Sequence, residues 1–536
     1  MLSSLLTFLR DHVPGFHRLE RLPQQVLGIN PFGGDLRPSR VPLFSPGRPT
    51  LPFPHPWNYD QPIRILETYF WGADAKQGPG RHNRYLDVPG FAPILATRDP
   101  RIIRAITTET GDRDGQFDRD TLPSVGIARA TGPDTLLFAN GPTWRKQKLL
   151  AAPPFGKTTL FQPEQFQEFA ATFTHTAIER LAALEQHLQV NGPPVRVRLE
   201  LEIKAVMLEM LAANFFGSQV SYDQIRHRYV PALEQMIGHI VRDTVMNRIG
   251  IPVWRLPRLS RRIAQAQEAY ATFEELTDLA LAARKEGKGL WRQFKSDASD
   301  AALRSNIRVF LAGALEATTS YASWAISHLA RDPSAQEKVY SEVKDIEDYT
   351  PENLDNATYL GHVLNETLRL TPSLYFLPRR ATADTRVETA DGTMLIPRGT
   401  HIFLDIWHAN RHEDHWGVAV TGHRALDFAP ERWEALAAQG RGSKDFLHFG
   451  FGHGPRVCPG KHLGQLEVGL VVGAFVKLFR FKAVKPDYQA KAGVSTKPQD
   501  GVLLELELRK PTAEANAAAD GKAKGSGVIS DTPALE

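Results

Sequence analysis

The sequence predicts a mainly α-helical fold with small β-sheets. Apolar residues recur at helical spacing over five long stretches, residues 163–186, 199–216, 258–286, 300–331 and 356–370. Strand-like patterns gather at only two places, near residues 83–97 and around residues 391–399. Helices therefore outnumber strands several-fold, and no long flexible linker interrupts the chain between about residue 56 and residue 510.

The elements follow in chain order. Residues 1–55 are rich in Pro and Gly, and we expect them to form an extended segment on the surface. Residues 83–97 carry two β-like runs around a Pro-Gly pair and predict a hairpin. Turn signals stand at 391–392 and 397–399, and leucines at helical spacing predict a helix over 461–478. Residues 56–510 are treated as one domain, whereas residues 511–536 have the composition of a disordered tail.

Charge and hydropathy exclude several classes of protein. The 536 residues include 64 basic and 60 acidic ones, a net charge of +4, which is too balanced to indicate nucleic-acid binding. The first apolar run, MLSSLLTFL, stops at Arg10, well short of the roughly 20 residues of a spanning helix. We expect a cytoplasmic protein or one that touches a membrane surface through a short amphipathic contact.

The chain has a single cysteine, Cys458, so it forms no intramolecular disulfide and no multi-cysteine zinc site. Residues 449–460 read FGFGHGPRVCPG, and a helix pattern starts just after them. A helix N-terminus favours the thiolate, the form that binds metals. A lone cysteine is more often a small buried apolar residue. A phosphate-binding loop is excluded because the glycine spacing is wrong and His462 replaces the Ser or Thr.

The pattern Phe-x-x-Gly-x-Arg-x-Cys-x-Gly over residues 451–460 resembles the haem-binding signature of the cytochrome P450 family, and all five fixed positions match. The resemblance implies the cytochrome P450 fold and a haem b cofactor. It implies that Cys458 is the axial thiolate, that Arg456 contacts a propionate and that Phe451 shields the sulfur.

Further segments resemble the family at the expected places. Glu366 and Arg369 share a helix face, and with Arg432 of the segment FAPERW they resemble a Glu–Arg–Arg network that holds the fold around the haem. Trp144 and Lys148 resemble a pair that contacts a propionate, with Lys where many relatives have Arg. The segment LPRR resembles another propionate contact, for which Arg379 fits better than Arg380.

The oxygen-activating helix is expected within residues 309–323, VFLAGALEATTSYAS, but its sequence departs from the family's Gly-x-acid-Thr core. We assign Thr318 as the hydroxyl and Glu316 as the acid of a proton relay. On a regular helix these residues lie about 200° apart, so a π-type bulge would be needed to bring both to the iron. The other reading is that water carries the proton.

The implied reaction is insertion of one oxygen atom from O2 into a small, apolar organic substrate. A separate reductase or ferredoxin would supply electrons to a monomeric enzyme, with Lys444, Lys461 and His462 near its docking face. Phe117, Phe215, Phe216, Met236 and Met246 are candidates for the substrate site, and core packing explains them equally well. A haem-thiolate isomerase or peroxygenase without electron donor, and a non-catalytic haem sensor, remain alternatives.

Three histidines, His408, His412 and His415, have the spacing of metal ligands. Their segment also resembles the surface stretch that precedes the Pro-Glu-Arg-Trp segment in the family. The sequence therefore favours ordinary surface histidines over a metal site.

Overall fold

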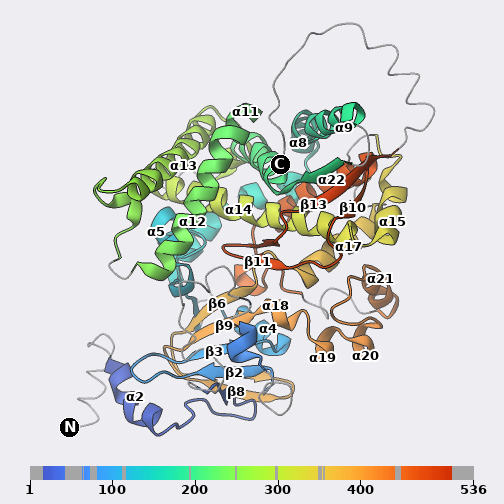
Figure 1. The fold of residues 1–536 in the computed structure, drawn as a ribbon. Helices are drawn as coiled ribbons and strands as arrows, with labels where there is room; N and C mark the ends of the chain where they lie inside the picture. Colours follow the sequence, from blue (N-terminus) through green and yellow to red (C-terminus); the bar gives the residue numbers. More distant parts are fainter. Residues whose placement is uncertain are drawn as a thin grey trace.

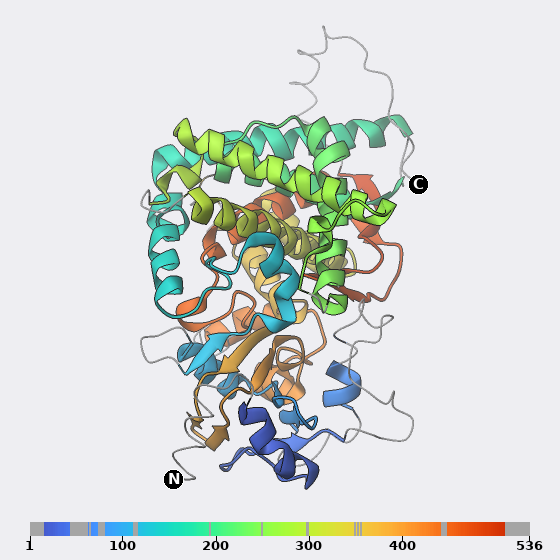
Figure 2. The same ribbon diagram turned by 90° about the vertical axis from the view of Figure 1, so that its left-hand side faces the viewer.

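The computed structural model describes residues 16–42, 63, 66–72, 81–110, 116–191, 195–247, 250–295, 300–347, 350, 353, 356–440 and 448–509. Most of the helices gather in one region of the molecule, and the largest sheet lies below them with the N-terminal residues (Figure 1). Seen from the side, the helices cross above the sheet region in layers (Figure 2). The mainly helical fold with small sheets is confirmed.

The largest sheet has six strands in the order β1-β2-β3-β9-β6-β4. The predicted hairpin is confirmed, because β2 and β3 pair antiparallel with Asn83 opposite Thr97. A second predicted turn, at Asp391-Gly392, joins β7 and β8. The strands of this region are β1 (Ser39–Arg40), β2 (Asn83–Leu86), β3 (Ile94–Thr97), β4 (Phe117–Arg119), β6 (Phe376–Ala381), β7 (Thr385–Thr389), β8 (Gly392–Ile396) and β9 (His401–Asp405).

The first half of the helical region contains several helices joined by π-helical turns. The expected helix over 163–186 is divided by such a turn at Thr174–Ile178, and another ends the stretch 200–216. These helices are α4 (Pro100–Thr108), α5 (Val125–Thr131), α6 (Gly141–Ala151), α7 (Lys157–Leu160), α8 (Pro163–Phe173), α9 (Glu179–Asn191), α10 (Glu200–Met210), α11 (Tyr222–Gln224), α12 (Val230–Met246) and α13 (Arg261–Lys285).

The second half is built around the 30-residue helix α14 (Asp300–Leu329). The helices that follow it are α15 (Pro333–Val343), α17 (Thr358–Leu370), α18 (Ile406–Ala409), α19 (Glu413–Trp416), α20 (Val418–Thr421), α21 (Glu431–Ala438) and α22 (Lys461–Leu478). Two small sheets complete it, formed by β5 (Val195–Arg198), β13 (Leu503–Leu508) and β10 (Phe479–Ala483), and by β11 (Ala490–Ala492) and β12 (Thr496–Pro498).

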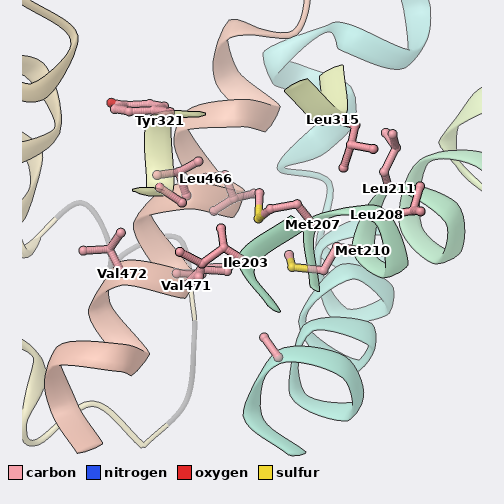
Figure 3. Close-up of a cluster of buried hydrophobic side chains, with 14 of the residues drawn as sticks. Ile203, Met207, Leu208, Met210, Leu211, Leu315, Tyr321, Leu466, Val471 and Val472 are labelled. Atoms are coloured by element: carbon pink, nitrogen blue, oxygen red, sulfur yellow. The ribbon is translucent and has the colours of Figure 1, made fainter. Parts of the chain in front are cut away.

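The largest core cluster lies where α10, α14 and α22 meet, and Figure 3 shows Met207, Leu315 and Leu466 among its buried side chains. These helices carry apolar residues around most of their circumference, as central helices do. Phe215 and Phe216 belong to the same cluster, in contact with the ring of Trp291. Packing in the core explains the positions of four substrate-site candidates, namely Phe117, Phe215, Phe216 and Met236.

The N-terminal segment differs from the expectation of extended chain. Residues Phe16–Val26 form helix α2, because this stretch holds Leu, Glu, Arg and Gln, which favour helix, ahead of the Pro- and Gly-rich part. Gln25 anchors its end by donating to Asp87 at 2.6 Å. Residues 1–15, the tail from 510 onward, Lys444 and the side chain of Met246 lie outside the described residues. Within the described part of the chain, no helix is both long and apolar enough to cross a membrane.

Candidate active site

Cys458 lies in a loop of consecutive turns that leads into α22. The amide of Cys458 donates to the carbonyl of Phe451 at 2.8 Å, and that of Gly452 donates to Phe449 at 2.8 Å. Gly454 has a φ of +71°, and a Cβ there would clash with the carbonyl of Thr107 on α4. Glycine is required at this position for both reasons, since it alone combines positive φ with so close an approach.

The surroundings of the Cys458 thiol act on its pKa in two opposite directions. Its side chain is accessible, although protein surrounds it closely enough that burial raises the pKa of the thiol to about 11. The amide of Gly460 opposes this shift by donating a hydrogen bond to the sulfur, which favours the thiolate. A substituent on Gly460 would stand 4.0 Å from the sulfur. The loop therefore presents an accessible sulfur that accepts one backbone hydrogen bond.

Three arginines meet in the interior beside this loop with too little negative charge around them. Burial and the guanidinium groups of Arg119 and Arg456 lower the pKa of Arg379 well below its usual value. Burial and Arg119 likewise lower the pKa of Arg456 to about 9, against the opposing charge of Asp118. The Nε atoms of Arg119 and Arg456 are buried and make no hydrogen bond among the described residues. Such a cluster fits a ligand that carries more than one anionic group, and the two propionates of haem are groups of this kind.

The predicted pair on α6 lies against the same loop. The Arg456 guanidinium stacks over the ring of Trp144 at 4.5 Å, and Lys148 Nζ stands 5.1 Å from that ring. Lys148 Nζ donates to the carbonyl of Pro455 at 2.8 Å, so it closes the loop from the outside. The structure thus brings together the sequence-predicted residues Trp144, Lys148, Arg379, Arg456 and Cys458.

Two polar residues at this site were missed by sequence reasoning. Arg119 ends β4, whose partner strand β6 carries Arg379 directly opposite it. Asn140 accepts from Arg456 Nη2 at 2.7 Å and from the amide of Arg119 at 2.9 Å, so it holds both groups. Only the pairing of β4 with β6 reveals them, because Arg119 and Arg379 are 260 positions apart in the sequence.

The Glu–Arg–Arg network is formed as expected. Glu366 accepts from Arg369 at 2.8 and 2.9 Å and from Arg432 at 3.3 Å, and all three side chains are fully buried. Arg369 also donates to the carbonyl of Asn410 at 2.7 Å, and the Asn410 amide donates to the carbonyl of His448 at the start of the cysteine loop. The network therefore holds that loop through its backbone.

The distal helix α14 remains a regular α-helix through residues 316–318, without a π-bulge. Thr318 lies on the side that faces α22, where its Cγ2 is 3.8 Å from the position of a Cβ on Gly464. Its hydroxyl donates to the carbonyl of Ala314 at 2.9 Å. Phe451 contacts this helix as well, with its ring 6.3 Å from that of Tyr321. Thr318 and the cysteine loop thus belong to one region of the molecule.

Glu316 lies on another face of α14 and is engaged there. It pairs with Lys204 of α10, with Lys497 of β12 at 3.1 Å, and accepts from Ser495 at 3.2 Å. Burial alone would raise the pKa of Glu316, but the charges of Lys204 and Lys497 outweigh it and lower the pKa. The carboxylate is therefore ionised and fully occupied. This geometry does not support the prediction that Glu316 acts beside Thr318 as the acid.

The sequence comparisons agree with this geometry. The profile of the family described as Cytochrome P450 matches residues 92–504. The chain belongs to the cytochrome P450 family. P450 proteins bind haem b through a cysteine thiolate, and this chain holds its one cysteine in the loop described above. The fold, the cofactor and a general monooxygenase activity follow from membership.

Among curated P450 relatives, Cytochrome P450 monooxygenase alt2 of Alternaria solani is 30% identical over 75% of this chain and 78% of its own length. Cytochrome P450 71D18 of Mentha gracilis is 28% identical over 76% and 80%. A cytokinin hydroxylase of Arabidopsis thaliana is 24% identical over 79% and 80%. Each of the three matches spans about three quarters of this chain, and only the name of the cytokinin hydroxylase indicates a substrate.

Proposed function

We propose that this P450 inserts one oxygen atom from O2 into a small, apolar organic substrate. Two electrons from a separate reductase or ferredoxin and two protons reduce the second oxygen atom to water, so that a C–H bond becomes C–OH. The observation that carries the proposal is the accessible thiol of Cys458 beside a buried cluster of unneutralised arginines. We expect the protein to act as a monomer.

In this proposal the Cys458 thiolate would hold the haem iron, and haem would supply the O2 chemistry when bound. Arg456 and Arg379 neutralise the propionates, with Trp144 stacked on Arg456 and Lys148 closing the loop at its carbonyl groups. Phe451 shields the sulfur on the side of Tyr321. Thr318 holds a proton at Oγ1 and can turn it from the carbonyl of Ala314 toward the substrate side. Glu316 positions α14 through its lysine partners and donates no proton.

An apolar substrate is supported by the helices that the family uses to enclose it. Helices α5 and α12 pack together through Ala130, Met236 and Ile240, and Ile127 stands partly buried at their edge. Side chains of this kind would line any opening between the two helices with apolar surface. Burial of apolar ligand area there contributes about 25 cal/mol per Å2.

The test uses the haem-loaded protein with a bacterial ferredoxin system or a P450 reductase and NADPH. Apolar compounds that shift the iron spin state are incubated under heavy-isotope O2, and products are analysed by mass spectrometry. We expect one heavy oxygen atom in the product and no product without the electron donor. Products that lack the isotope would contradict the proposal.

A donor-independent reaction is the second candidate, favoured by the distal helix. Ala317 precedes Thr318 where the family has an acid, and Glu316 is held on another face. A peroxide already carries the electrons and protons that this acid would otherwise help to deliver. Turnover with peroxide at a rate equal to that with NADPH and reductase would favour this candidate over the monooxygenase.

A further inference from the structure

Three histidines from two distant segments meet at the edge of the large sheet. His82 precedes β2, whereas His412 precedes α19 and His415 lies within it. One ring nitrogen of each lies within 4.8 Å of the others, and the ring centroids are 4.6 to 5.6 Å apart. The sequence spacing had grouped His412 and His415 with His408. That residue is held away from the group by Asp405 at 2.7 Å and by Glu67 at 3.5 Å.

Some ring nitrogens of this histidine cluster make no hydrogen bond to the described residues and are available to bind a metal. His82 is more than nine-tenths buried, and its Nε2 lies 2.9 Å from a carboxylate oxygen of Asp414 and 3.1 Å from Nε of Arg81. Its Nδ1 is buried and has no hydrogen-bond partner among the described residues, and the same holds for Nε2 of His415. His412 Nδ1 lies 3.2 Å from the amide nitrogen of Asp414 and 3.6 Å from its carboxylate, so the tautomer with the proton on Nδ1, facing the carboxylate, leaves the Nε2 lone pair for a ligand. Buried nitrogens without a hydrogen bond are costly, so two of them together need an explanation.

The chemistry of the cluster suits a transition metal. The ring nitrogens of His82, His412 and His415 gather within 4.8 Å of one another, and neutral imidazole is a common metal ligand. Metal-binding histidines commonly donate their second ring N–H to a carboxylate, as His82 can to Asp414.

Both signs of charge surround the cluster. Asp414 is paired with Arg81 at 2.5 Å, and Asp99 is paired with Arg101 at 2.9 Å. Arg98 lies close enough to add positive charge to the field at His82 and His412. The cluster thus has two carboxylates against three arginines. Neutral nitrogen ligands, which favour Zn2+ over the harder cations Mg2+ and Ca2+, would have to supply most of the binding energy.

We propose that His82, His412 and His415 bind one Zn2+ ion, with Asp414 orienting His82 from behind. Zn–N bonds of about 2.1 Å in a tetrahedral site place the nitrogens about 3.4 Å apart, so small ring rotations would complete the site. The fourth position would hold water or the carboxylate of Asp414. This inference does not depend on the oxygenase reaction, because the cluster shares no residue with the haem site.

The role of such a site would be structural. It would tie the segment before α20 to β2, more than 300 positions away in the sequence. The next residue after His415, Trp416, accepts from Arg432 at 2.8 Å through its carbonyl, and its ring lies 5.3 Å from Arg369. Zinc would therefore brace the loop against which the buried arginines of the Glu366 network are held.

The experiment uses the full-length, haem-loaded protein after treatment with a chelator. Zn2+ is titrated by calorimetry, and the zinc ligands are identified by X-ray absorption at the zinc edge. We expect one Zn2+ per chain, a ligand set with three imidazoles, and a rise in Tm upon binding. His412→Gln and His415→Gln should each weaken binding at least tenfold.

The matched control is His175→Gln, which removes a histidine whose side chain is 75% exposed and should leave Zn2+ affinity unchanged. The haem absorption spectrum shows whether each variant is folded. The proposal is overturned if the native protein shows no saturable 1:1 binding, or if its zinc has fewer than three imidazole ligands. It is also overturned if the folded His412 and His415 variants bind Zn2+ as tightly as the control, and none of these results bears on the oxygenase proposal.

Discussion

The cysteine loop and the distal helix α14 lie in one region of the molecule, and they differ in how their chemistry is encoded. In the loop, backbone turns and close contacts place the residues, such as the amide of Cys458 on Phe451 and the approach of Gly454 to Thr107. The helix α14 has the same backbone conformation along its length. The role of each side chain therefore depends on the neighbouring elements that its face of the helix contacts. A short motif therefore predicts the loop, whereas the distal helix requires tertiary structure.

The largest expected effect tests whether the loop depends on the buried network beneath it. Glu366→Gln removes the one carboxylate among the described residues that Arg369 and Arg432 share, and leaves both buried cations without that charged partner. We expect the free energy of unfolding to fall by about 3–5 kcal/mol in urea titrations, with loss of haem. Glu268→Gln breaks an exposed pair with Arg258 and serves as control, with an effect near zero. Equal stability of the two variants would contradict the role of the network.

A second effect follows from the raised pKa of the Cys458 thiol, about 11 against an ordinary 9. The folded apoprotein holds a neutral thiol, while the iron-bound sulfur is a thiolate, so haem binding releases a proton below pH 11. Haem affinity should then rise about tenfold per pH unit between pH 7 and pH 9. The same shift stabilises the apoprotein below about pH 9, and this contribution is lost as the pH rises through 11. Haem titration of the apoprotein at several pH values measures the slope, and a flat profile would contradict the neutral thiol.

The arginine cluster gives a third test, because its charges repel each other until an anion arrives. Arg119→Met should raise the stability of the apoprotein, since it removes a buried cation beside Arg379 and Arg456. The same variant should weaken haem binding by about tenfold or more, the equivalent of one charge-assisted hydrogen bond. Chemical unfolding of the apoprotein and haem transfer to apomyoglobin measure the two effects. A destabilised apoprotein with unchanged haem affinity would show that Arg119 serves only packing.

The smallest effect on the fold concerns the distal helix. Thr318→Val removes a hydroxyl whose hydrogen bonds to described residues go to carbonyls of its own helix. The free energy of unfolding should therefore change by less than about 1 kcal/mol. Product formed per O2 consumed should nevertheless fall several-fold. Glu316→Gln should do the reverse and lower stability, because Lys204 and Lys497 lose their buried partner, while the product ratio is retained. A fall in that ratio for Glu316→Gln at unchanged stability would restore the carboxylate as the acid.

The sequence predicted the long helices, the two hairpins and the cysteine loop, because these depend on local spacing. It also predicted Trp144, Lys148, Arg379 and Arg456 as neighbours, on the strength of a family motif. It missed Arg119 and Asn140, whose role arises from the pairing of β4 with β6, and it missed His82 as the partner of His412. It also did not predict the ion pairs of Glu316, because the lysines that bind it come from α10 and β12. What escaped prediction in each case was a contact between distant segments.

The central claim is that Cys458 is the thiolate ligand of the haem. The carbon monoxide difference spectrum of the reduced protein tests it most directly, with native protein and Cys458→Ala measured side by side. We predict the absorption band of thiolate-ligated ferrous haem for the native chain and its loss in the variant. A variant that retains this band, or a native protein that binds haem without it, would contradict the account.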